Sequence, residues 1–220
     1  MISCLSGGKI MILGISGSGR KNRIIHQTVK AIVEETGYEY ELLSLAGKRI
    51  NGCVGCTLCA ADNICKLEDD WNEIGKKMSE ADVIVFGAPN YYGTINALGH
   101  ACLERTFSFR HQGVFTLQNK IGISVSTSRS MTAHDPVKEL IQRFMKSNKM
   151  NILGHVTSEG YDQCYTCGFG RDCEVGNVVK DHGILEKIED RHYPKDFDEQ
   201  DKTLKLVHKA SKLIKDALKF

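Results

Sequence analysis

The pattern of hydrophobic and polar residues divides most of the chain into short apolar runs that alternate with amphipathic stretches. Continuous apolarity is typical of strands that are covered on both faces, as in a parallel sheet. Runs of this kind predict five strands, at residues 9–15, 38–45, 82–87, 121–126 and 150–156. Apolar positions at helical spacing predict helices between them, over about residues 24–33, 70–79, 95–107 and 135–147. This alternation predicts an α/β fold built on a doubly wound, five-stranded parallel sheet.

The end of the chain, residues 201–220, shows a longer amphipathic pattern. One stripe carries leucine, valine, isoleucine and alanine, and lysines fill much of the remaining surface. We interpret it as a C-terminal helix that packs on the domain and keeps a solvated face. Binding to a partner or to a membrane surface is the alternative. We therefore divide the chain into residues 1–157, the sheet domain, and 158–220, an extension that ends in this helix.

Composition and charge narrow the class of protein. A hydrophobic content of 41% in 220 residues is enough for one substantial core. A net charge of +2 gives no reason to expect binding to nucleic acid or to a membrane. The apolar runs are too short to cross a bilayer, and residues 1–8 do not resemble a signal peptide. Nine cysteines without such a signal predict a cytoplasmic protein that uses its thiols for metal or redox chemistry.

Four cysteines gather in a short stretch with the spacing C-x2-C-x2-C-x5-C. They are Cys53, Cys56, Cys59 and Cys65, within a loop at residues 50–67. Such dense spacing is characteristic of iron–sulfur ligation, and the small residues between them let backbone N–H groups approach a bulky cluster. Structural zinc is less favoured, because zinc sites usually use two separated knuckles. Disulfides are also less favoured, because neighbouring thiols rarely meet the required geometry.

A second group of cysteines has the spacing C-x2-C-x5-C. It consists of Cys164, Cys167 and Cys173. We interpret it as a second iron–sulfur site, with zinc and a thiol-only role as open alternatives. Its fourth ligand could be Cys4, Cys102, His155, His182 or a residue of another subunit, or the fourth position could stay open. Cys4 and Cys102 are more often idle thiols than ligands.

Small polar residues follow the first predicted strand and precede a helix, an arrangement that binds anions at the helix N-terminus. The candidate phosphate-binding residues are Ser16, Ser18, Gly19, Arg20 and Asn22. The loop lacks the order required of a nucleoside triphosphate loop, and Asn22 stands where a dinucleotide loop has its third glycine. A hydroxyl-rich loop with one arginine fits a terminal phosphomonoester such as that of FMN, which flavodoxin-like sheets hold at their switch point. The alternative is a turn that merely caps the helix.

Two further loops come off the carboxyl ends of predicted strands, where open α/β sheets bind ligands. We expect the first to contact a flavin ring, with a tyrosine-bearing surface loop as the alternative, and the second is another small polar loop at the end of a strand. The candidate residues are Pro89, Asn90, Tyr91, Tyr92, Gly93 and Thr94 in the first loop, and Ser126, Thr127 and Arg129 in the second.

The cysteine loop and the flavin loops together resemble the iron–sulfur flavoprotein family, within the NADPH-dependent FMN reductase branch of the flavodoxin-like superfamily. The similarity covers about residues 9–157, and the compact cysteine spacing is its specific part. The segment Gly14-Ile-Ser-Gly-Ser-Gly-Arg-Lys-Asn22 is similar to the family's first FMN loop, and Ala88-Pro-Asn-Tyr-Tyr-Gly93 is similar to its second. Two features depart from the pattern: Gly19 and Arg23-Ile24-Ile25 replace proline and hydroxyl residues, and the second cysteine group is additional.

This resemblance implies a flavodoxin-like fold, FMN in the three loops, and a [4Fe-4S] cluster on the first four cysteines. It also implies a homodimer or homotetramer. We therefore expect an oxidoreductase that passes electrons from a ferredoxin-like donor to a small-molecule acceptor, because a cluster transfers single electrons and FMN transfers one or two. The alternatives are an NAD(P)H-dependent FMN or quinone reductase, a non-enzymatic redox sensor, and a zinc-stabilised binding module. No catalytic side chain stands out in the sequence.

Overall fold

The computed structural model describes residues 9–129 and 134–219. A parallel sheet with the strand order β2-β1-β3-β5-β6 forms its centre, and the two-residue strand β4 pairs antiparallel with the end of β3. Apolar side chains make most of these strands, which are β1 (Met11–Ser16), β2 (Glu39–Ser44), β3 (Val83–Tyr91), β4 (Thr94–Ile95), β5 (Ile121–Ser128) and β6 (Asn151–Glu159). The chain reverses direction along the sheet at β1, so the flavodoxin-like strand order is confirmed.

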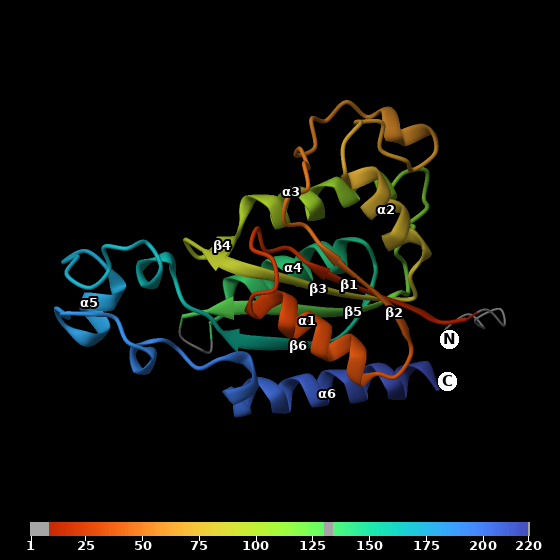
Figure 1. Cartoon of the computed structure of the whole chain (residues 1–220). Helices are drawn as coiled ribbons and strands as arrows, with labels where there is room; N and C mark the ends of the chain where they lie inside the picture. The colour runs from red at the N-terminus through yellow and green to blue at the C-terminus, as the bar shows by residue number, and fades with distance from the viewer. Residues whose placement is uncertain (1–8, 130–133, 220) are drawn as a thin grey trace.

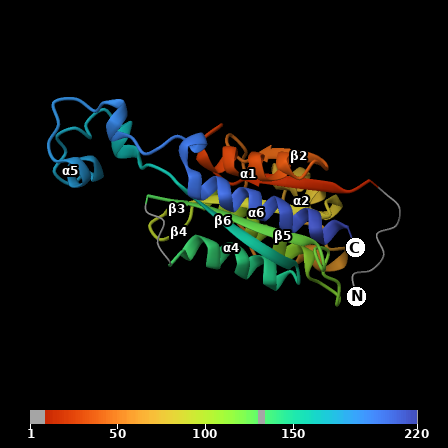
Figure 2. The same ribbon diagram turned by 90° about the horizontal axis from the view of Figure 1, so that it is seen from below.

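Helices cover both faces of the sheet (Figures 1 and 2). The α-helices are α1 (Ile24–Glu35), α2 (Trp71–Glu80), α3 (Ala97–Glu104), α4 (Pro136–Ser147), α5 (Asn177–His182) and α6 (Asp201–Leu218). Short 3-10 turns are η1 (Leu58–Ala61), η2 (Arg105–Phe109), η3 (Gln163–Tyr165), η4 (Asp190–His192) and η5 (Phe197–Glu199).

Two hydrophobic clusters lie on opposite faces of the sheet. On one face, α2, α3 and α4 pack against β1 and β3, with Trp71 and Phe86 among the largest fully buried side chains. On the other face, α1 and α6 pack against β1, β3, β5 and β6. Strands β1 and β3 contribute to both clusters, which explains why they appear in the sequence as continuous apolar runs, whereas β5 contributes only to the second.

Several elements differ in extent from the expectation. The apolar run at residues 82–87 continues as a strand to Tyr91, because its end pairs with β4. The polar residues 126–128 belong to β5, because their backbone pairs with residues 157–159 of β6. The expected helix over residues 95–107 is shorter, spanning Ala97–Glu104, and continues as the 3-10 turn η2. The sheet accordingly contains β4 in addition to the five expected strands.

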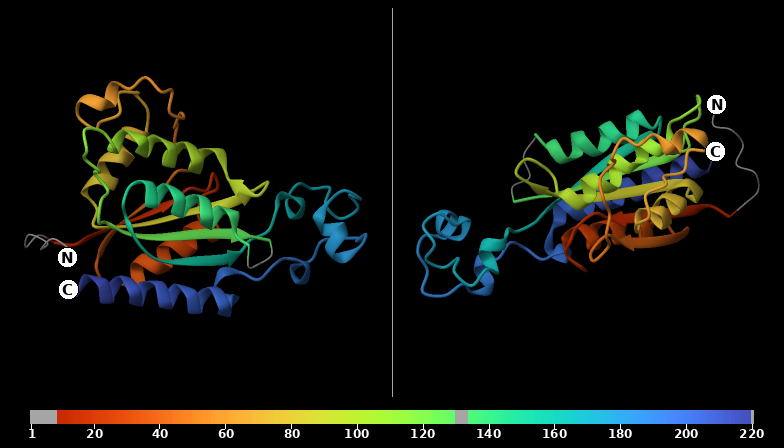
Figure 3. Two further views of the ribbon diagram at one scale, coloured as in Figure 1. Left: turned by 180° about the vertical axis from the view of Figure 1, so that it is seen from behind. Right: turned by 90° about the horizontal axis from the view of Figure 1, so that it is seen from above.

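The polypeptide after β6 has two parts. Residues 160–196, named the cysteine lobe here, project beyond the carboxyl ends of the strands (Figures 1 and 3). The chain then returns, and α6 packs along β6 and α1 with Val207, Ala210 and Ile214 in the core. The packed interpretation of this C-terminal helix is therefore confirmed, while the boundary at residue 157 stays a prediction. Across the described residues, the helices are all too short or too polar to cross a bilayer.

Candidate functional site

A cavity of about 680 Å³ lies at the carboxyl ends of the strands. Its walls come from the loop after β1, the end of β3, the end of β5 and the start of the cysteine lobe. Expected flavin-binding residues on these walls are Ser18, Arg20, Asn22, Pro89, Asn90, Tyr91, Tyr92, Thr127 and Arg129. The expected residues Ser16, Gly19, Gly93, Thr94 and Ser126 do not line it. Three separate loops thus meet at one cavity of the size that small ligands and cofactors use.

The loop after β1 is held tightly against the neighbouring strand. The N–H of Gly17 donates to the carbonyl oxygen of Gly87, and a Cβ atom at Gly17 would lie 2.8 Å from that same oxygen. The side chain of Asn96, at the start of α3, donates to the carbonyl oxygen of Gly17. Only glycine permits this close approach between the two backbones. The loop is therefore fixed before any ligand binds.

Several polar groups of this loop remain available to a phosphate. The Oγ atom of Ser16 is buried and has no hydrogen-bond partner among the described residues. The N-cap of α1 is Arg23, and its side chain makes no capping hydrogen bond to the first turn. Asn22 adopts a positive φ of 52° immediately before it. Free N–H groups at a helix N-terminus and a buried hydroxyl fit a phosphate group.

The end of β3 and β4 form a hairpin beside the cavity. Tyr92 and Gly93 make the turn, both with positive φ, and the Oδ1 atom of Asn90 accepts from the N–H of Gly93. The Tyr92 side chain is fully exposed, whereas Tyr91 is only partly exposed. The hairpin therefore presents polar backbone and two aromatic rings at the cavity rim, as a site for a planar ring requires.

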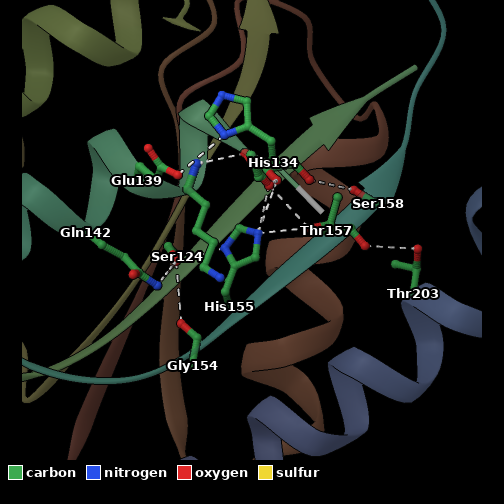
Figure 4. Close-up of polar contacts among 12 residues, drawn as sticks. Ser124, His134, Glu139, Gln142, Gly154, His155, Thr157, Ser158 and Thr203 are labelled. Carbon is green, nitrogen blue, oxygen red and sulfur yellow. Dashed lines mark hydrogen bonds and ion pairs between the residues drawn. The ribbon is translucent and has the colours of Figure 1, made fainter. Parts of the chain in front are cut away.

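Ser126 points away from the cavity, into a buried polar network. Its Oγ donates to Oδ2 of Asp135 at 2.5 Å, and the same carboxylate oxygen lies 3.0 Å from Nε2 of His155. Figure 4 shows His155 between Ser124 and Thr157, each 2.8 Å from one of its ring nitrogens. This order resembles a catalytic triad, but Ser124 is fully buried and cannot reach a substrate. The network instead joins α4 to β5 and β6.

The carboxyl of Asp135 is strongly affected by this network. Burial alone would raise its pKa, but hydrogen bonds from His155 and Ser126 and from the backbone of Lys138 hold the pKa well below its usual range. The negative charge of Asp135 is therefore retained at neutral pH, at the N-terminus of α4.

The first four cysteines line a second, smaller cavity together with Arg105. Cys53 and Cys56 are exposed, Cys65 is half-buried and Cys59 is buried. Burial raises the pKa of Cys59, and the charges of the other three cysteines raise this pKa further, so the four thiols are electrostatic neighbours. Gly55 and Thr57 adopt positive φ, which lets the backbone wrap around the cavity. This cavity has a volume of about 20 Å³, and its four cysteines are the ligand set that a [4Fe-4S] cluster uses.

Sequence reasoning missed three side chains that support this cysteine loop. Glu104 accepts from the N–H of Cys53, Arg105 donates from Nε to Sγ of Cys65 at 3.2 Å, and Nε2 of His111 lies 3.1 Å from Sγ of Cys59. Glu104 is the last residue of α3, Arg105 begins the 3-10 turn η2, and His111 follows η2. The local signal in the sequence is the charged pair Glu104-Arg105 directly after the apolar residues Cys102 and Leu103.

Arg105 is fully buried and paired. Its Nη1 lies 2.7 Å from Oδ2 of Asp69. Burial alone would raise the pKa of Asp69, but hydrogen bonds from Arg105 and from the N–H groups of Asn51 and Trp71 lower it. The pair therefore stays charged, with the guanidinium directed at a thiol of the cavity.

The second cysteine group lies in the cysteine lobe, and one of its members faces the large cavity. Cys164 lines that cavity with Asp162 and Asn177, and none of the first four cysteines does so. The N–H of Asn177 lowers the pKa of Cys164, but burial and the negative charge of Asp162 outweigh it, so the pKa is raised overall. Within the described ranges, no three histidine, cysteine, aspartate or glutamate side chains converge closely enough for a single metal ion.

The residues considered as a fourth ligand lie in different places. Cys102 is fully buried on α3, and burial raises its pKa to about 12. His155 belongs to the Asp135 network, and Nε2 of His182 lies 3.1 Å from the hydroxyl of Tyr165. Cys4 lies outside the described residues.

Comparisons with known proteins agree with this architecture. A family model described as NADPH-dependent FMN reductase matches residues 10–162. The chain belongs to the NADPH-dependent FMN reductase family. An iron–sulfur flavoprotein of Methanocaldococcus jannaschii is 36% identical over 149 residues, which cover 65% of this chain and 75% of that protein. An iron–sulfur flavoprotein of Methanosarcina thermophila is 31% identical over 147 residues, which cover 65% and 76% of the two chains.

Solved structures give the same fold. The crystal structure of RosB with a bound riboflavin phosphate derivative matches with a TM-score of 0.60 at 15% identity, over 96% of this chain and 81% of that one. A flavone reductase matches with a TM-score of 0.52 at 17% identity, over 95% and 64%. As a member of this family the protein is a flavin-dependent oxidoreductase with FMN as its flavin, and the family match ends before Cys164.

Proposed function

We propose that the protein is an iron–sulfur flavoprotein that receives single electrons from a ferredoxin-like donor and delivers them through FMN to a small-molecule acceptor. The observation that carries this proposal is the presence of two cavities with different chemistry on one sheet. One is lined by four thiols, and the other by three flavin-type loops. A cluster transfers one electron at a time and FMN transfers one or two, so the pair couples the two kinds of redox partner.

FMN would occupy the cavity at the carboxyl ends of the strands. Its phosphate would lie at the loop after β1, where Ser18 and Arg20 line the cavity and the N-terminus of α1 has no side-chain cap. The flavin ring would lie between the β3–β4 hairpin and the end of β5, near Tyr91 and Thr127. Thr127 and Arg129 remain candidates for ring contacts.

A [4Fe-4S] cluster would be held by Cys53, Cys56, Cys59 and Cys65. Four cysteines are the ligand set of such a cluster, and these four line one cavity. The Arg105 guanidinium would offset part of the negative charge that four thiolates bring. Because Cys53 and Cys56 are exposed, a donor protein could approach the cluster closely.

Helix α3 links the two cavities. At its start, Asn96 donates to the carbonyl oxygen of Gly17 in the FMN loop, and at its end Glu104 accepts from the N–H of Cys53 in the cysteine loop. The helix spans Ala97–Glu104, roughly 12 Å at the usual rise per residue. A rigid element thus sets the relative position of the two cofactor loops.

The assembly and location of the protein form part of the same proposal. Large apolar side chains are exposed around the cysteine loop, namely Val54, Leu58, Ile64, Phe107 and Val114. Such a patch favours association, and we propose a homodimer or homotetramer, to be checked by light scattering after size exclusion. We also propose the cytoplasm as its location, where thiols stay reduced.

The cofactor content tests the proposal directly. The protein is purified anaerobically, and FMN, iron, sulfide and zinc are counted per chain. We expect FMN with at least four irons and as many sulfides. Cys59→Ala should lose iron and keep FMN, whereas Cys102→Ala, which removes a buried thiol outside both cavities, should keep both. Zinc without sulfide, or a chain that never binds FMN, would refute the proposal.

A second candidate for the electron source is NADPH, which the family description names. The basic residues Arg20 and Arg23 at the rim of the large cavity could bind a nucleotide phosphate. Steady oxidation of NADPH by the FMN-loaded protein, without a ferredoxin, would favour this function over the ferredoxin-dependent one.

A further inference from the structure

The second cysteine group lies beside the flavin cavity, whereas the first group does not. Cys164 shares the cavity wall with Ser18, Pro89 and Thr127, residues of all three flavin loops. Cys53, Cys56, Cys59 and Cys65 line a different cavity, beyond the far end of α3. Within one chain, the second cysteine group is therefore the one that lies beside the flavin cavity.

The cysteine lobe is fixed to the flavin loops by direct contacts. Nη1 of Arg129, at the end of β5, lies 2.5 and 2.6 Å from the two carboxylate oxygens of Asp181 on α5. Nη1 of Arg23 donates to the hydroxyl of Tyr161 at 3.1 Å. Arg129 and Arg23 belong to segments that line the cavity, so these contacts fix the lobe as one wall of the site.

Backbone amides in the lobe point at its thiols. Gly168, with φ of +87°, turns the chain after Cys167, and the N–H of Phe169 then donates to Sγ of Cys167 at 3.4 Å. The N–H of Asn177 donates to Sγ of Cys164, also at 3.4 Å. Hydrogen bonds from N–H groups to sulfur are one of the means by which proteins tune iron–sulfur centres.

Two glycines, Gly170 and Gly176, let the backbone pass close to Cys164 and Cys173. A Cβ atom at Gly170 would lie 1.9 Å from the carbonyl oxygen of Cys164, so only glycine lets the chain fold back onto Cys164. A Cβ atom at Gly176 would lie 3.3 Å from Sγ of Cys173. Since Gly176 precedes Asn177, whose N–H contacts Cys164, the thiols of Cys164 and Cys173 approach the same turn.

We infer that Cys164, Cys167 and Cys173 hold a second iron–sulfur centre, and that this centre is the direct electron partner of the flavin within the chain. The inference rests on the proposed function, since it takes FMN to occupy the cavity. The cysteine spacing and the two N–H groups that donate to Cys164 and Cys167 are typical of iron–sulfur centres. Three cysteines leave one position to a ligand of another kind, as the substitution of cysteine in some iron–sulfur centres illustrates.

The electron balance of this transfer is simple. Reduction of FMN to its dihydro form takes two electrons and two protons. Such a centre would give up one electron at a time, so it would be oxidised twice for each flavin reduced, and a one-electron donor such as a ferredoxin-type protein would re-reduce it after each oxidation. The two protons come from solvent.

The test uses the full-length protein purified anaerobically with FMN bound. Iron and sulfide are counted per chain, and the fluorescence lifetime of the bound FMN is measured, because a nearby redox centre quenches an excited flavin. We expect about eight irons in the unmodified protein, and a loss of about four in Cys173→Ala together with a longer FMN lifetime. Glu174→Ala, an exposed change at the neighbouring position, should alter neither quantity.

The outcomes separate this inference from the proposed function. FMN with only four irons in the unmodified protein, or zinc bound to the lobe, overturns the inference and leaves the proposed function intact. So does an FMN lifetime that responds to Cys59→Ala and not to Cys173→Ala. Absence of FMN from every preparation overturns the proposed function itself. If Cys173→Ala does not fold, the iron and sulfide counts of the unmodified protein and of Cys164→Ser decide the matter.

Discussion

Arg105 donates a hydrogen bond from Nε to Sγ of Cys65 at 3.2 Å, while its Nη1 pairs with Asp69 at 2.7 Å. A positive charge with no exposed surface thus lies against one thiol of the first cysteine group. Net charge and hydrogen bonds to sulfur set the potential of an iron–sulfur cluster. If the proposed cluster is bound, Arg105 would stabilise its reduced, more negative state.

Replacing Arg105 by methionine should lower the reduction potential of the cluster, because the reduced state loses a positive charge and a hydrogen bond. It should also destabilise the fold by about 3–5 kcal/mol, because Asp69 would remain buried without its partner. A redox titration and a denaturant titration measure the two effects. Lys66→Met, which removes an exposed charge beside the same cavity, is the control and should shift the potential less.

The double variant Asp69→Asn/Arg105→Met separates the two effects. It should recover part of the stability, because no buried charge is left unpaired, while the potential stays low. A potential equal to that of the unmodified protein would show that Arg105 acts only on the fold.

The Asp135 network predicts a specific acid sensitivity. The folded-state pKa of Asp135 lies below its unfolded value, which is about 4. Its contribution to stability is therefore complete above that unfolded value and is lost as the pH falls towards the folded pKa. Asp135→Asn should cost about 1.5–3 kcal/mol at pH 7, the usual range for hydrogen bonds to a charged group, and should flatten the acid limb of the stability curve.

Denaturant titrations from about pH 6, above the unfolded carboxyl pKa, down to about pH 2 would measure this effect. Glu139→Gln, an exposed change on the same helix, serves as the control. An acid limb that is equally steep in Asp135→Asn and in the unmodified protein would contradict the assignment of acid sensitivity to this network.

The main fold could be predicted because the buried strands carry their signal locally. Residues 10–15 and 83–86 are apolar throughout, since helices cover both of their faces. The apolar run predicts a strand that ends at residue 126, followed by a polar loop, yet β5 continues to Ser128. The hydroxyl of Ser126 is satisfied by Asp135, a partner that sequence periodicity cannot identify.

The candidate site was predictable in its loops and not in its supporting contacts. The loops after β1 and β3 could be predicted as ligand-binding loops, because parallel strands end at the same edge of the sheet and ligands bind there. Glu104 and His111 meet the cysteine loop from 51 and 52 residues away, so no local pattern could reveal them. The position of Cys164 on the flavin cavity depends on the path of the chain after β6, where no regular periodicity guides prediction.

The ion pair between Arg129 and Asp181 should stabilise the cysteine lobe locally rather than the whole fold. Both side chains are about a third exposed, so the pair should contribute less than about 1 kcal/mol. Asp181→Asn should therefore leave the denaturation midpoint nearly unchanged while hydrogen exchange speeds up in residues 160–196. Asp172→Asn removes a comparably placed carboxylate that pairs only with the adjacent Arg171, and it should not change exchange. Equal exchange in both variants would show that the pair does not hold the lobe.

Two glycines of the first flavin loop offer a matched pair for testing the cavity. A Cβ atom at Gly17 would lie 2.8 Å from the backbone oxygen of Gly87, whereas a Cβ atom at Gly19 would meet nothing within 4 Å. Gly17→Ala should thus push the loop away from β3, destabilise the fold by about 1–3 kcal/mol and weaken FMN binding about tenfold or more. Gly19→Ala should bind FMN normally. Titration of the apoprotein with FMN, followed by flavin fluorescence, measures both affinities. If both variants bind FMN as the unmodified protein does, the phosphate does not depend on the position of this loop, and the FMN cavity must be assigned elsewhere.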